Sequence, residues 1–383
     1  MAMVMQRALE QLNQLAKLAV EHEKSRNGSI LSLEHLDSLQ EALLALREKE
    51  MPQLEAMAAW YGAWLGQECV RKYGARWIGL AEPVAPRIRL RGYLFSPIDV
   101  VRRAIIDPDE FCIQAVVHQI KQWAHSVNQR EESARRHNAT VWNSELLNSE
   151  FSGDTGLPRN QAEALAAVDP WLSEAGFVGR ELLCLGAGGG RHAPLHAIAG
   201  AQVTVLDIAS AQLAIDEAIS QELDLNLQIV QGSMDDLTMF EDQSFDLVLQ
   251  PVSACYIPDL DPLYSEVARV LRVDGHYLVQ HKQPSVLQAR RSENSNYYEW
   301  ALPQIEGQPL PPSHDSDPAY RESETLEFLH SYDAMLGGLC RAGFVIEALT
   351  EPPRADAFAP SDMPEHQAWF MPPYLKVKAR RVK

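Results

Sequence analysis

The chain contains few cysteines, and their spacing suggests neither a metal site nor a disulfide framework. Five cysteines stand at positions 69, 112, 184, 255 and 340 of the 383 residues, and none forms a CxxC pair. An odd and scattered set argues against a disulfide-stabilised secreted domain, and the missing CxxC pairs argue against a zinc knuckle. We therefore expect a reducing environment and no bound metal.

Long apolar runs are also missing. No run of about 18 apolar residues occurs, which is the length a helix needs to cross a bilayer. The first residues, Met-Ala-Met-Val-Met-Gln-Arg, are too polar for a signal peptide. The sequence thus predicts no membrane span, and the cytoplasm is the expected location.

An excess of basic residues is absent as well. Residues 1–150 hold 18 basic and 19 acidic residues, whereas residues 151–383 hold 16 basic and 33 acidic residues. Because proteins that bind nucleic-acid phosphates usually present a basic face, the acidic second part is a poor candidate for such binding. The 46% share of hydrophobic residues is typical of a folded chain with at least one large core.

The first third of the chain is dominated by apolar residues at helical spacing. This spacing predicts helices over 3–24, 33–48, 52–73, 97–106 and 110–126, with two short strands over 76–80 and 88–93. We interpret residues 1–125 as a smaller, helix-rich α+β domain of unknown function. The polar stretch 126–158 is predicted to be a linker or a connecting helix.

The periodicity changes in the second part of the chain. Short apolar runs alternate with helical patterns, and a last strand is expected within 366–379. Such alternation predicts a doubly wound parallel sheet, whose ligands bind at the carboxyl edge of the strands. The predicted strands are 182–185, 203–206, 227–230, 245–249 and 277–279, and the predicted helices are 191–199, 210–222 and 260–272.

A glycine-rich loop follows the first of these strands. Gly186, Gly188 and Gly190 fit the spacing GxGxG, whereas the dinucleotide pattern GxGxxG would need glycine where Arg191 stands. The next strand ends in Asp207, and a carboxylate at that position can accept hydrogen bonds from both ribose hydroxyls. Strand, loop, helix, strand and acid in this order predict a nucleoside-binding site.

With its later motifs, the chain resembles the class I S-adenosylmethionine-dependent methyltransferases, and within them the ubiquinone/menaquinone-type enzymes that act on small molecules. The resemblance covers about residues 140–350. It implies an α/β fold with a Rossmann-like, seven-stranded sheet over residues 159–383, and S-adenosyl-L-methionine as cofactor. The motifs that carry it are Gly186-Ala-Gly-Gly-Gly190, Val205-Leu-Asp207, Gln231-Gly-Ser-Met-Asp-Asp-Leu237, Phe245-Asp-Leu-Val-Leu-Gln250, Val270-Leu-Arg-Val-Asp-Gly275 and Cys340-Arg-Ala-Gly-Phe344.

The resemblance also implies which residues contact the cofactor. The glycines of the loop, Gly186, Gly188 and Gly190, would lie along its methionine part. Asp207 would hold the ribose, Ile208 would pack on the adenine, and Gln250 would face the cofactor or the substrate. Along the adenine edge we expect Ser233, Met234 and Asp235. One position departs from the family pattern, because Cys184 stands where an acid usually orients the cofactor's amino-acid end.

Methyl transfer from a sulfonium needs alignment and exclusion of water, and it needs a base only when the acceptor must lose a proton. We expect His281 as the candidate base, since it ends a strand at the ligand edge, and Tyr256 as a second candidate. A strand-end histidine with a structural hydrogen bond and a core tyrosine are the alternatives. Residues 284–330 are predicted to form an insertion that acts as a lid, and 126–158 a segment that covers the cofactor.

The prediction is therefore a methyltransferase that acts on a small molecule, with no nucleic-acid partner. Its N-terminal domain could serve dimerisation, acceptor selection or partner docking. A nucleic-acid or protein methyltransferase is the first alternative, with a basic recognition patch on residues 1–125. A regulatory protein that binds S-adenosylmethionine without turnover is the second, and a nicotinamide dehydrogenase, opposed by Arg191, the third. The residues proposed for that patch are Arg71, Lys72, Arg76, Arg87, Arg89, Arg91, Arg102 and Arg103.

Overall fold

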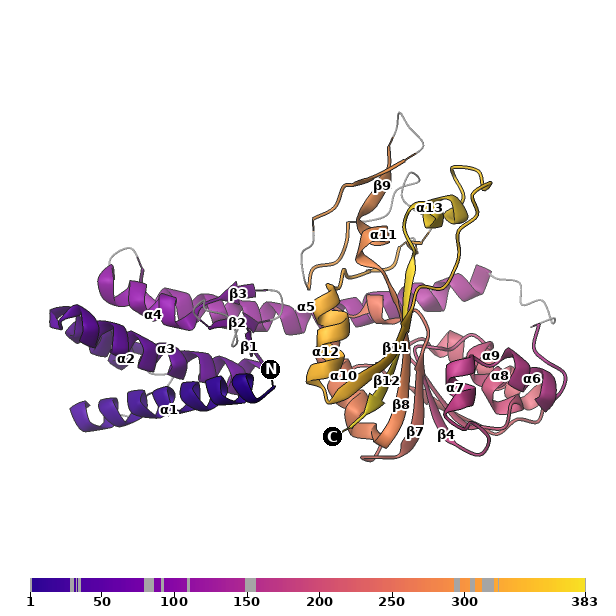
Figure 1. The fold of residues 1–383 in the computed structure, drawn as a ribbon, viewed down its shortest axis with the longest axis horizontal. Coiled ribbons are helices and arrows are strands. Elements are labelled where there is room, and N and C mark those ends of the chain that lie inside the picture. The colour runs from indigo at the N-terminus through magenta and orange to yellow at the C-terminus, as the bar shows by residue number, and fades with distance from the viewer. Residues whose placement is uncertain are drawn as a thin grey trace. The chain divides into compact units, whose positions relative to one another are not determined.

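A computed structural model describes residues 2–27, 31, 33, 36–78, 86–90, 93–108, 111–148, 156–292, 297–303, 307–311, 320–322 and 324–382. The chain forms two units, residues 1–130 and 131–383 (Figure 1). The boundary between them falls inside helix α5 (Ile113–Asn148).

The first unit combines long helices with a small antiparallel sheet. Its helices are α1 (Ala2–Asn27), α2 (Leu36–Ala45), α3 (Met51–Tyr73) and α4 (Pro97–Ile106), and a 3-10 turn spans Leu46–Glu48. Its strands β1 (Arg76–Ile78), β2 (Arg87–Leu90) and β3 (Tyr93–Phe95) pair in this order. The predicted single strand over 88–93 is thus wrong, because the chain reverses between β2 and β3 and pairs with itself.

Helix α5 continues far beyond the helix predicted over 110–126. Its later turns carry the charged cluster of the predicted linker, where Arg136 pairs with Glu132 at 2.6 Å, one helical turn earlier. Pairs at this spacing stabilise a solvent-exposed helix face, so the polar composition here supports a helix rather than a loop. Residues 149–155 of the predicted covering segment 126–158 lie outside the described residues.

The second unit contains a seven-stranded sheet in the order β11-β12-β8-β7-β4-β5-β6. Strands β4 to β8 are parallel to one another, and β12 pairs antiparallel with β8 and β11. The chain runs outward from β4 to β6 and then returns to β7 on the other side of β4. Ligands of such sheets bind at this reversal point, above the carboxyl end of β4. The strands are β4 (Glu181–Leu185), β5 (Gln202–Asp207), β6 (Leu227–Gln231), β7 (Phe245–Gln250), β8 (Leu271–Lys282), β11 (Phe344–Thr350) and β12 (Tyr374–Arg381).

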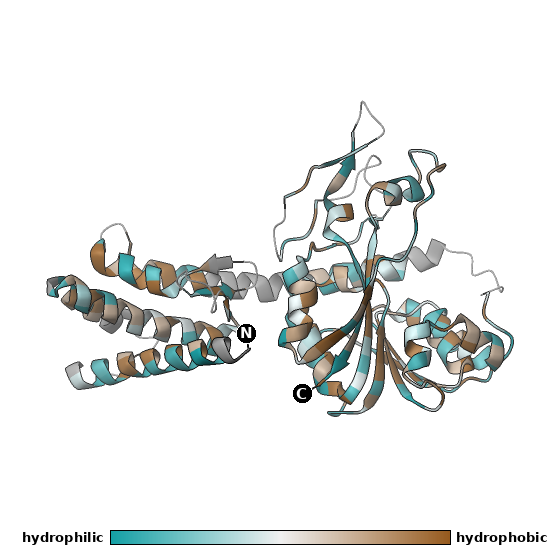
Figure 2. Ribbon diagram, viewed as in Figure 1, coloured by the Kyte–Doolittle hydropathy of each residue, from teal (hydrophilic) through white to brown (hydrophobic). Residues whose placement is uncertain are grey.

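Helices cover both faces of this sheet, as predicted (Figure 1). Alternate residues of one strand enter different cores, since Leu183 packs in one apolar cluster and Leu182 and Cys184 in the other. The central strands accordingly carry the brown of apolar residues in Figure 2. One face is covered by α6 (Gln161–Ala167), α7 (Pro170–Glu174), α8 (His192–Ile198) and α9 (Ser210–Glu222), the other by α10 (Leu260–Val270), a π-helical turn (Asp333–Gly337) and α12 (Gly338–Arg341).

Two predicted boundaries need correction. The helix predicted over 260–272 ends at Val270, because β8 begins at Leu271, directly after it. Within 366–379 the strand begins only at Tyr374, whereas the aromatic residues before it belong to helix α13 (Pro364–Phe370). Among the described residues, no helix is both long enough and apolar enough to cross a membrane.

The described part of the predicted insertion 284–330 contains one short helix and two short strands. Helix α11 (Pro284–Gln288) is followed by the paired strands β9 (Ala289–Arg291) and β10 (Tyr298–Trp300). Val286, Leu310 and Tyr320 share a small apolar core with Ala368 of α13. The insertion therefore packs against the C-terminal region through a core of its own.

Candidate active site

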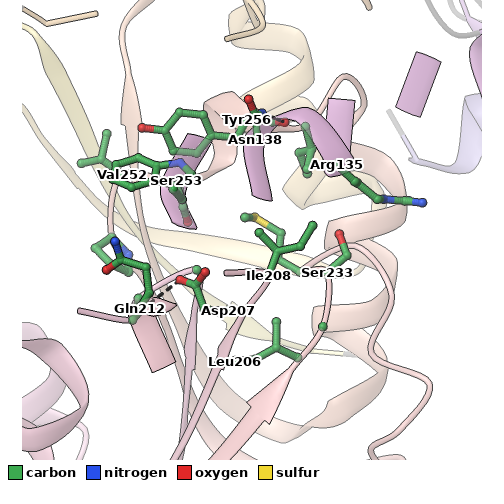
Figure 3. A pocket seen from close by; sticks show the side chains of 18 of the residues that line it. Arg135, Asn138, Leu206, Asp207, Ile208, Gln212, Ser233, Val252, Ser253 and Tyr256 are labelled. Atoms are coloured by element: carbon green, nitrogen blue, oxygen red, sulfur yellow. Dashed lines mark hydrogen bonds between the residues drawn. The ribbon is translucent and has the colours of Figure 1, made fainter. Parts of the chain in front are cut away.

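A cavity of about 320 Å³ lies at the carboxyl edge of the sheet (Figure 3). This volume is in the range of roughly 300–1,000 Å³ that is usual for small-molecule sites. In Figure 3, Asp207 and Gln212 lie opposite Tyr256 and Asn138. The lining residues are Arg135, Asn138, Trp142, Gly186, Ala187, Gly188, His192, Leu206, Asp207, Ile208, Gln212, Gly232, Ser233, Met234, Pro251, Val252, Ser253, Tyr256, Ile257 and Glu322.

The glycine loop after β4 brings bare backbone to the cavity. Gly186 has a φ of 52°, and a Cβ atom there would lie 2.7 Å from the Ser253 hydroxyl oxygen. At Gly188 a Cβ atom would lie 2.8 Å from the Gln212 Cβ and 3.2 Å from Asp207 Oδ2. Neither position has room for a side chain, so only glycine leaves the backbone free to approach a ligand.

Asp207 ends β5 and ties the glycine loop to the next helix. Its Oδ2 accepts a hydrogen bond from the Gly188 N–H at 3.1 Å, and its Oδ1 accepts one from the Ala209 N–H at 2.9 Å. Burial raises the pKa of this carboxyl above its ordinary value, and the backbone donors oppose the shift. These donors position the carboxylate at the cavity wall.

A second carboxylate, which the sequence analysis missed, holds the loop from behind. Asp216 of α9 is buried and accepts hydrogen bonds from the N–H groups of Gly189 at 2.9 Å and Gly190 at 3.2 Å. Cys184 lies close enough for Asp216 to add to the effect of burial, which raises the pKa of its thiol. The buried face of α9 thus supplies a loop-holding acid in a chain that carries Cys184 at the usual acidic position. In the sequence, Asp216 is an acidic residue among the apolar positions of the helix predicted over 210–222.

Replacing Asp216 by asparagine is expected to remove part of the pH dependence of stability. Burial raises the pKa of Asp216 from 3.8 to about 7, so the folded chain keeps a proton there that the unfolded chain has lost. The Asp216 carboxyl therefore makes its full contribution to the free energy of unfolding below about pH 4, and this contribution is lost as the pH rises towards 7. Between pH 6 and pH 7, the free energy of unfolding of Asp216→Asn should fall by up to about 1 kcal/mol less than that of the wild type.

Urea denaturation at about pH 6, 7 and 8 measures this difference. Glu217→Gln is the matched control, because Glu217 is the next residue of the same helix and is exposed. Burial also raises the pKa of Glu327 to about 7, and that contribution cancels because wild type and variant share it. Equal slopes for the wild type and Asp216→Asn would contradict the role given to Asp216.

Gln250 supports the cavity wall from below and does not line the cavity. Its side chain is buried, and Nε2 donates to the Ser253 hydroxyl at 3.2 Å and to Met234 Sδ at 3.0 Å. Its Oε1 accepts a hydrogen bond from the Tyr277 hydroxyl. Gln250 therefore fixes two wall residues, and its own amide is fully used.

Asp235 also stands outside the lining. Its carboxylate accepts hydrogen bonds from Arg135 at 2.7 Å and from the Ser233 hydroxyl. Arg135, together with Asn138 and Trp142, comes from the last turns of α5 and lines the cavity. All three residues lie within the segment 126–158, which the sequence predicts to cover the cofactor.

An aromatic and acidic group forms the wall opposite Asp207. The rings of Tyr256 and Trp142 meet edge to face with centroids 5.7 Å apart. The Tyr256 hydroxyl donates a hydrogen bond to Glu322, and burial raises the pKa of Tyr256 well above its ordinary value. Glu322 comes from the insertion, and nothing in its local sequence marked it.

The expected base His281 lies elsewhere. It is buried, and its Nε2 is 3.2 Å from the Tyr264 hydroxyl, while burial lowers its pKa to about 3. Neither His281 nor Gly190 lines the cavity, whereas the other predicted residues Gly186, Gly188, Asp207, Ile208, Ser233, Met234 and Tyr256 do.

Comparison with known proteins agrees with this geometry. The family model described as "Methyltransferase domain" matches residues 183–279. The chain is 34% identical over 176 residues to the uncharacterised methyltransferase YbaJ of Bacillus subtilis (strain 168), a match that covers 45% of this chain and 69% of that protein. The chain belongs to the class I S-adenosylmethionine-dependent methyltransferases. This methyltransferase is therefore similar to a relative over most of that relative's length.

Other similarities of the methyltransferase are shorter or weaker. It is 38% identical over 80 residues to the ubiquinone/menaquinone biosynthesis C-methyltransferase UbiE of Brucella anthropi, which is 20% of this chain and 30% of that protein. A solved S-adenosylmethionine-dependent methyltransferase from Mesorhizobium loti is 24% identical, with a TM-score of 0.44 over 57% of this chain and 96% of that one.

The cofactor of the methyltransferase is S-adenosyl-L-methionine. The residues present fit such a ligand. Gly186 and Gly188 expose bare backbone to the cavity, because a Cβ atom there would collide with Ser253 or Gln212. Asp207 presents a carboxylate beside them. A nucleoside with an amino-acid tail needs this combination of bare backbone and a fixed acid.

Proposed function

We propose that this enzyme transfers the methyl group of S-adenosylmethionine to a small molecule bound in the same cavity. The observation that carries the proposal is the continuity of the cavity. One wall is the glycine loop and Asp207, and the opposite wall is Tyr256, Trp142 and Glu322. A cavity of this size, whose lining surface is mostly apolar, favours a small acceptor over a polymer.

The cavity suggests a role for each wall. Gly186 and Gly188 would contact the methionine part of the cofactor, and Asp207 the ribose hydroxyls. Ile208 and the Ser233–Met234 pair would border the adenine. The wall formed by Tyr256 and its neighbours is then left for the acceptor.

When bound, S-adenosylmethionine supplies a methyl group already activated by its sulfonium. The protein then has to hold the acceptor in line and exclude water. Asn138 of α5 contributes to this enclosure, because its amide donates to the carbonyls of Tyr256 at 3.3 Å and Leu326 at 3.0 Å. It also accepts a hydrogen bond from the Leu326 N–H at 2.8 Å, so the covering helix is tied to both acceptor-side segments.

Two of the eight residues of the expected basic patch are paired with acids within the N-terminal unit, and Arg91 of that patch lies outside the described residues. Arg71 contacts Glu68 at 2.8 Å, and Arg102 contacts Glu55 at 3.0 Å and Asp99 at 2.7 Å. Such pairing reduces the positive potential that phosphate binding requires.

Radiolabelled methyl transfer tests the proposal. The full chain is incubated with methyl-labelled S-adenosylmethionine and with separate small-molecule, protein and RNA fractions of a cell extract. We expect label to accumulate in the small-molecule fraction, and to be absent when Asp207→Ala is used. Label that enters only the protein or RNA fraction would contradict a small-molecule acceptor.

A further inference from the structure

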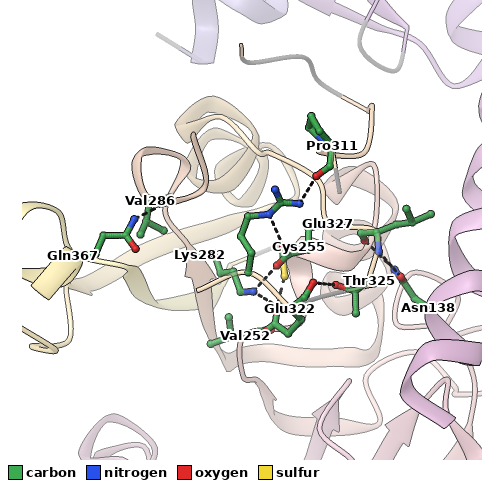
Figure 4. A network of polar contacts seen from close by, with 12 residues as sticks. Asn138, Val252, Cys255, Lys282, Val286, Pro311, Glu322, Thr325, Glu327 and Gln367 are labelled. Atoms are coloured by element: carbon green, nitrogen blue, oxygen red, sulfur yellow. Dashed lines mark hydrogen bonds and ion pairs between the residues drawn. The ribbon is translucent and has the colours of Figure 1, made fainter. Parts of the chain in front are cut away.

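A cluster of charged side chains adjoins the acceptor wall and shares Glu322 with it, and Figure 4 shows the contacts of this cluster. Lys282, at the end of β8, contacts both Glu322 and Glu327, and Arg321 Nε donates to Glu327 at 3.1 Å. The side chains of Lys282, Glu327 and Arg321 are 1%, 0% and 2% exposed, but that of Glu322 is 35% exposed. Glu322 is the member of this cluster that lines the cavity.

A structural role alone does not explain this cluster, because burying charged groups is energetically unfavourable. The cluster takes the side chains of Lys282, Arg321 and Glu327 out of water, and buried ion networks of this kind contribute little net stability compared with apolar packing. Such groups beside a cavity are more often found where a site needs one of them in a defined charge state. Here the chain places three buried ionisable side chains next to Glu322, which lines the cavity.

The neighbours of Glu322 keep it ionised. Burial favours its neutral form, but Lys282 and the hydrogen bonds from Glu327, Lys282 and Tyr256 outweigh burial and lower its pKa. Tyr256 stays neutral and directs its proton towards Glu322. At this wall, the carboxylate oxygens of Glu322 and the remaining lone pair of Tyr256 can therefore only accept hydrogen bonds from a ligand.

We propose that Glu322 binds the N–H or O–H group of the methyl acceptor and takes its proton, so that the substrate is an amine or a hydroxyl compound. This inference rests on the proposed function. In the transfer, a lone pair on the acceptor nitrogen or oxygen forms the bond to the methyl carbon. The carbon–sulfur bond breaks with its electron pair going to sulfur, and the acceptor's proton moves to a Glu322 oxygen.

The other cluster members act as positioning residues. Lys282 fixes one oxygen of Glu322, Glu327 fixes Lys282, and Arg321 in turn fixes Glu327. Tyr256 holds the carboxylate from the cavity side, and Lys282 also lies 5.9 Å from the centre of its ring. The side chain of Glu322 is thus held from several directions, as a group that must meet a reacting atom requires.

Sinefungin tests the position of Glu322 without a known acceptor. This analogue of S-adenosylmethionine carries a protonated amine where the sulfonium carries its methyl group, whereas S-adenosylhomocysteine has nothing there. If Glu322 faces the methyl position, Glu322→Gln should weaken sinefungin binding by roughly tenfold to a hundredfold, the range expected for a lost hydrogen bond between charged groups. Binding of S-adenosylhomocysteine should change by less than about twofold.

Glu324→Gln is the matched control, because it makes the same chemical change two residues away on an exposed side chain. An unchanged ratio of the two affinities in Glu322→Gln, including equal losses for both ligands, would overturn the inference. If Glu322→Gln folds poorly, Glu322→Asp serves as a second variant for the same comparison. Failure of the wild type to bind either ligand would instead contradict the proposed function.

The labelled product supplies an independent readout. Mass spectrometry of the methylated compound from the extract experiment identifies the atom that received the methyl group. A new N-methyl or O-methyl group supports the inference, whereas a methyl group on carbon or sulfur contradicts it.

Discussion

Replacing Lys282 by methionine is expected to lower the free energy of unfolding by about 3–5 kcal/mol, the usual effect of breaking a buried ion pair. The variant would leave Glu322 and Glu327 with Arg321 as their cation in the cluster, and Glu327 has no exposed surface. Urea denaturation at neutral pH measures the loss. A second substitution, Glu327→Gln, should restore part of the stability because it returns the cluster to one cation and one acid.

Arg136→Met is the control for this experiment. Arg136 lies on α5 and pairs at 2.6 Å with Glu132, and the two side chains are 79% and 49% exposed. An exposed pair contributes about 0–1 kcal/mol, so the control should remain close to the wild type. If Lys282→Met were as mild as Arg136→Met, the cluster would not be the tightly coupled unit described above.

Replacing Asp207 by alanine is expected to reduce the affinity for S-adenosylhomocysteine at least about a hundredfold. The variant would lose a charged acceptor for two ribose hydroxyls, and each such hydrogen bond contributes about 1.5–3 kcal/mol. It would also release the N–H groups of Gly188 and Ala209 from their present acceptor. Isothermal titration calorimetry measures the affinity.

Asp242→Ala serves as the control for Asp207→Ala. The side chain of Asp242 is 72% exposed and pairs with Arg269, outside the cavity lining. The affinity of Asp242→Ala for S-adenosylhomocysteine should equal that of the wild type. Retained binding in Asp207→Ala would show that the ribose is held elsewhere.

The parts of the site formed by neighbouring residues could be predicted from the sequence. The glycine loop and Asp207 each follow a strand, and parallel strands bring their carboxyl ends to one edge. Their presence at one cavity therefore depends on two strand predictions, both of which the structure confirms. The sheet itself could be predicted in the same way, from apolar runs that alternate with helices.

Side-chain direction was harder to predict than position along the chain. His281 lies near the end of a strand at the ligand edge. Its side chain lies on the same face of β8 as those of Tyr277 and Val279, towards α10. Gln250 likewise ends β7, yet its side chain turns into the core below the cavity. A residue's place at the edge does not reveal which face it joins, because a shift by one residue reverses the face.

Contacts between distant parts of the chain were the hardest to predict. Trp142 lies in the segment predicted to cover the cofactor, whereas Glu322 reaches the cavity from the insertion and was not predicted. Asp216 contacts the glycine loop across 26 and 27 positions of the sequence. Only the folded chain brings such residues together.

Titration of the wild-type chain with S-adenosylmethionine and S-adenosylhomocysteine is the most direct test of the central claim, that the cavity between the glycine loop and Tyr256 is a cofactor site. We expect each ligand to bind to one site per chain with micromolar affinity, and the two to compete. A folded wild-type chain that binds neither ligand would contradict the claim.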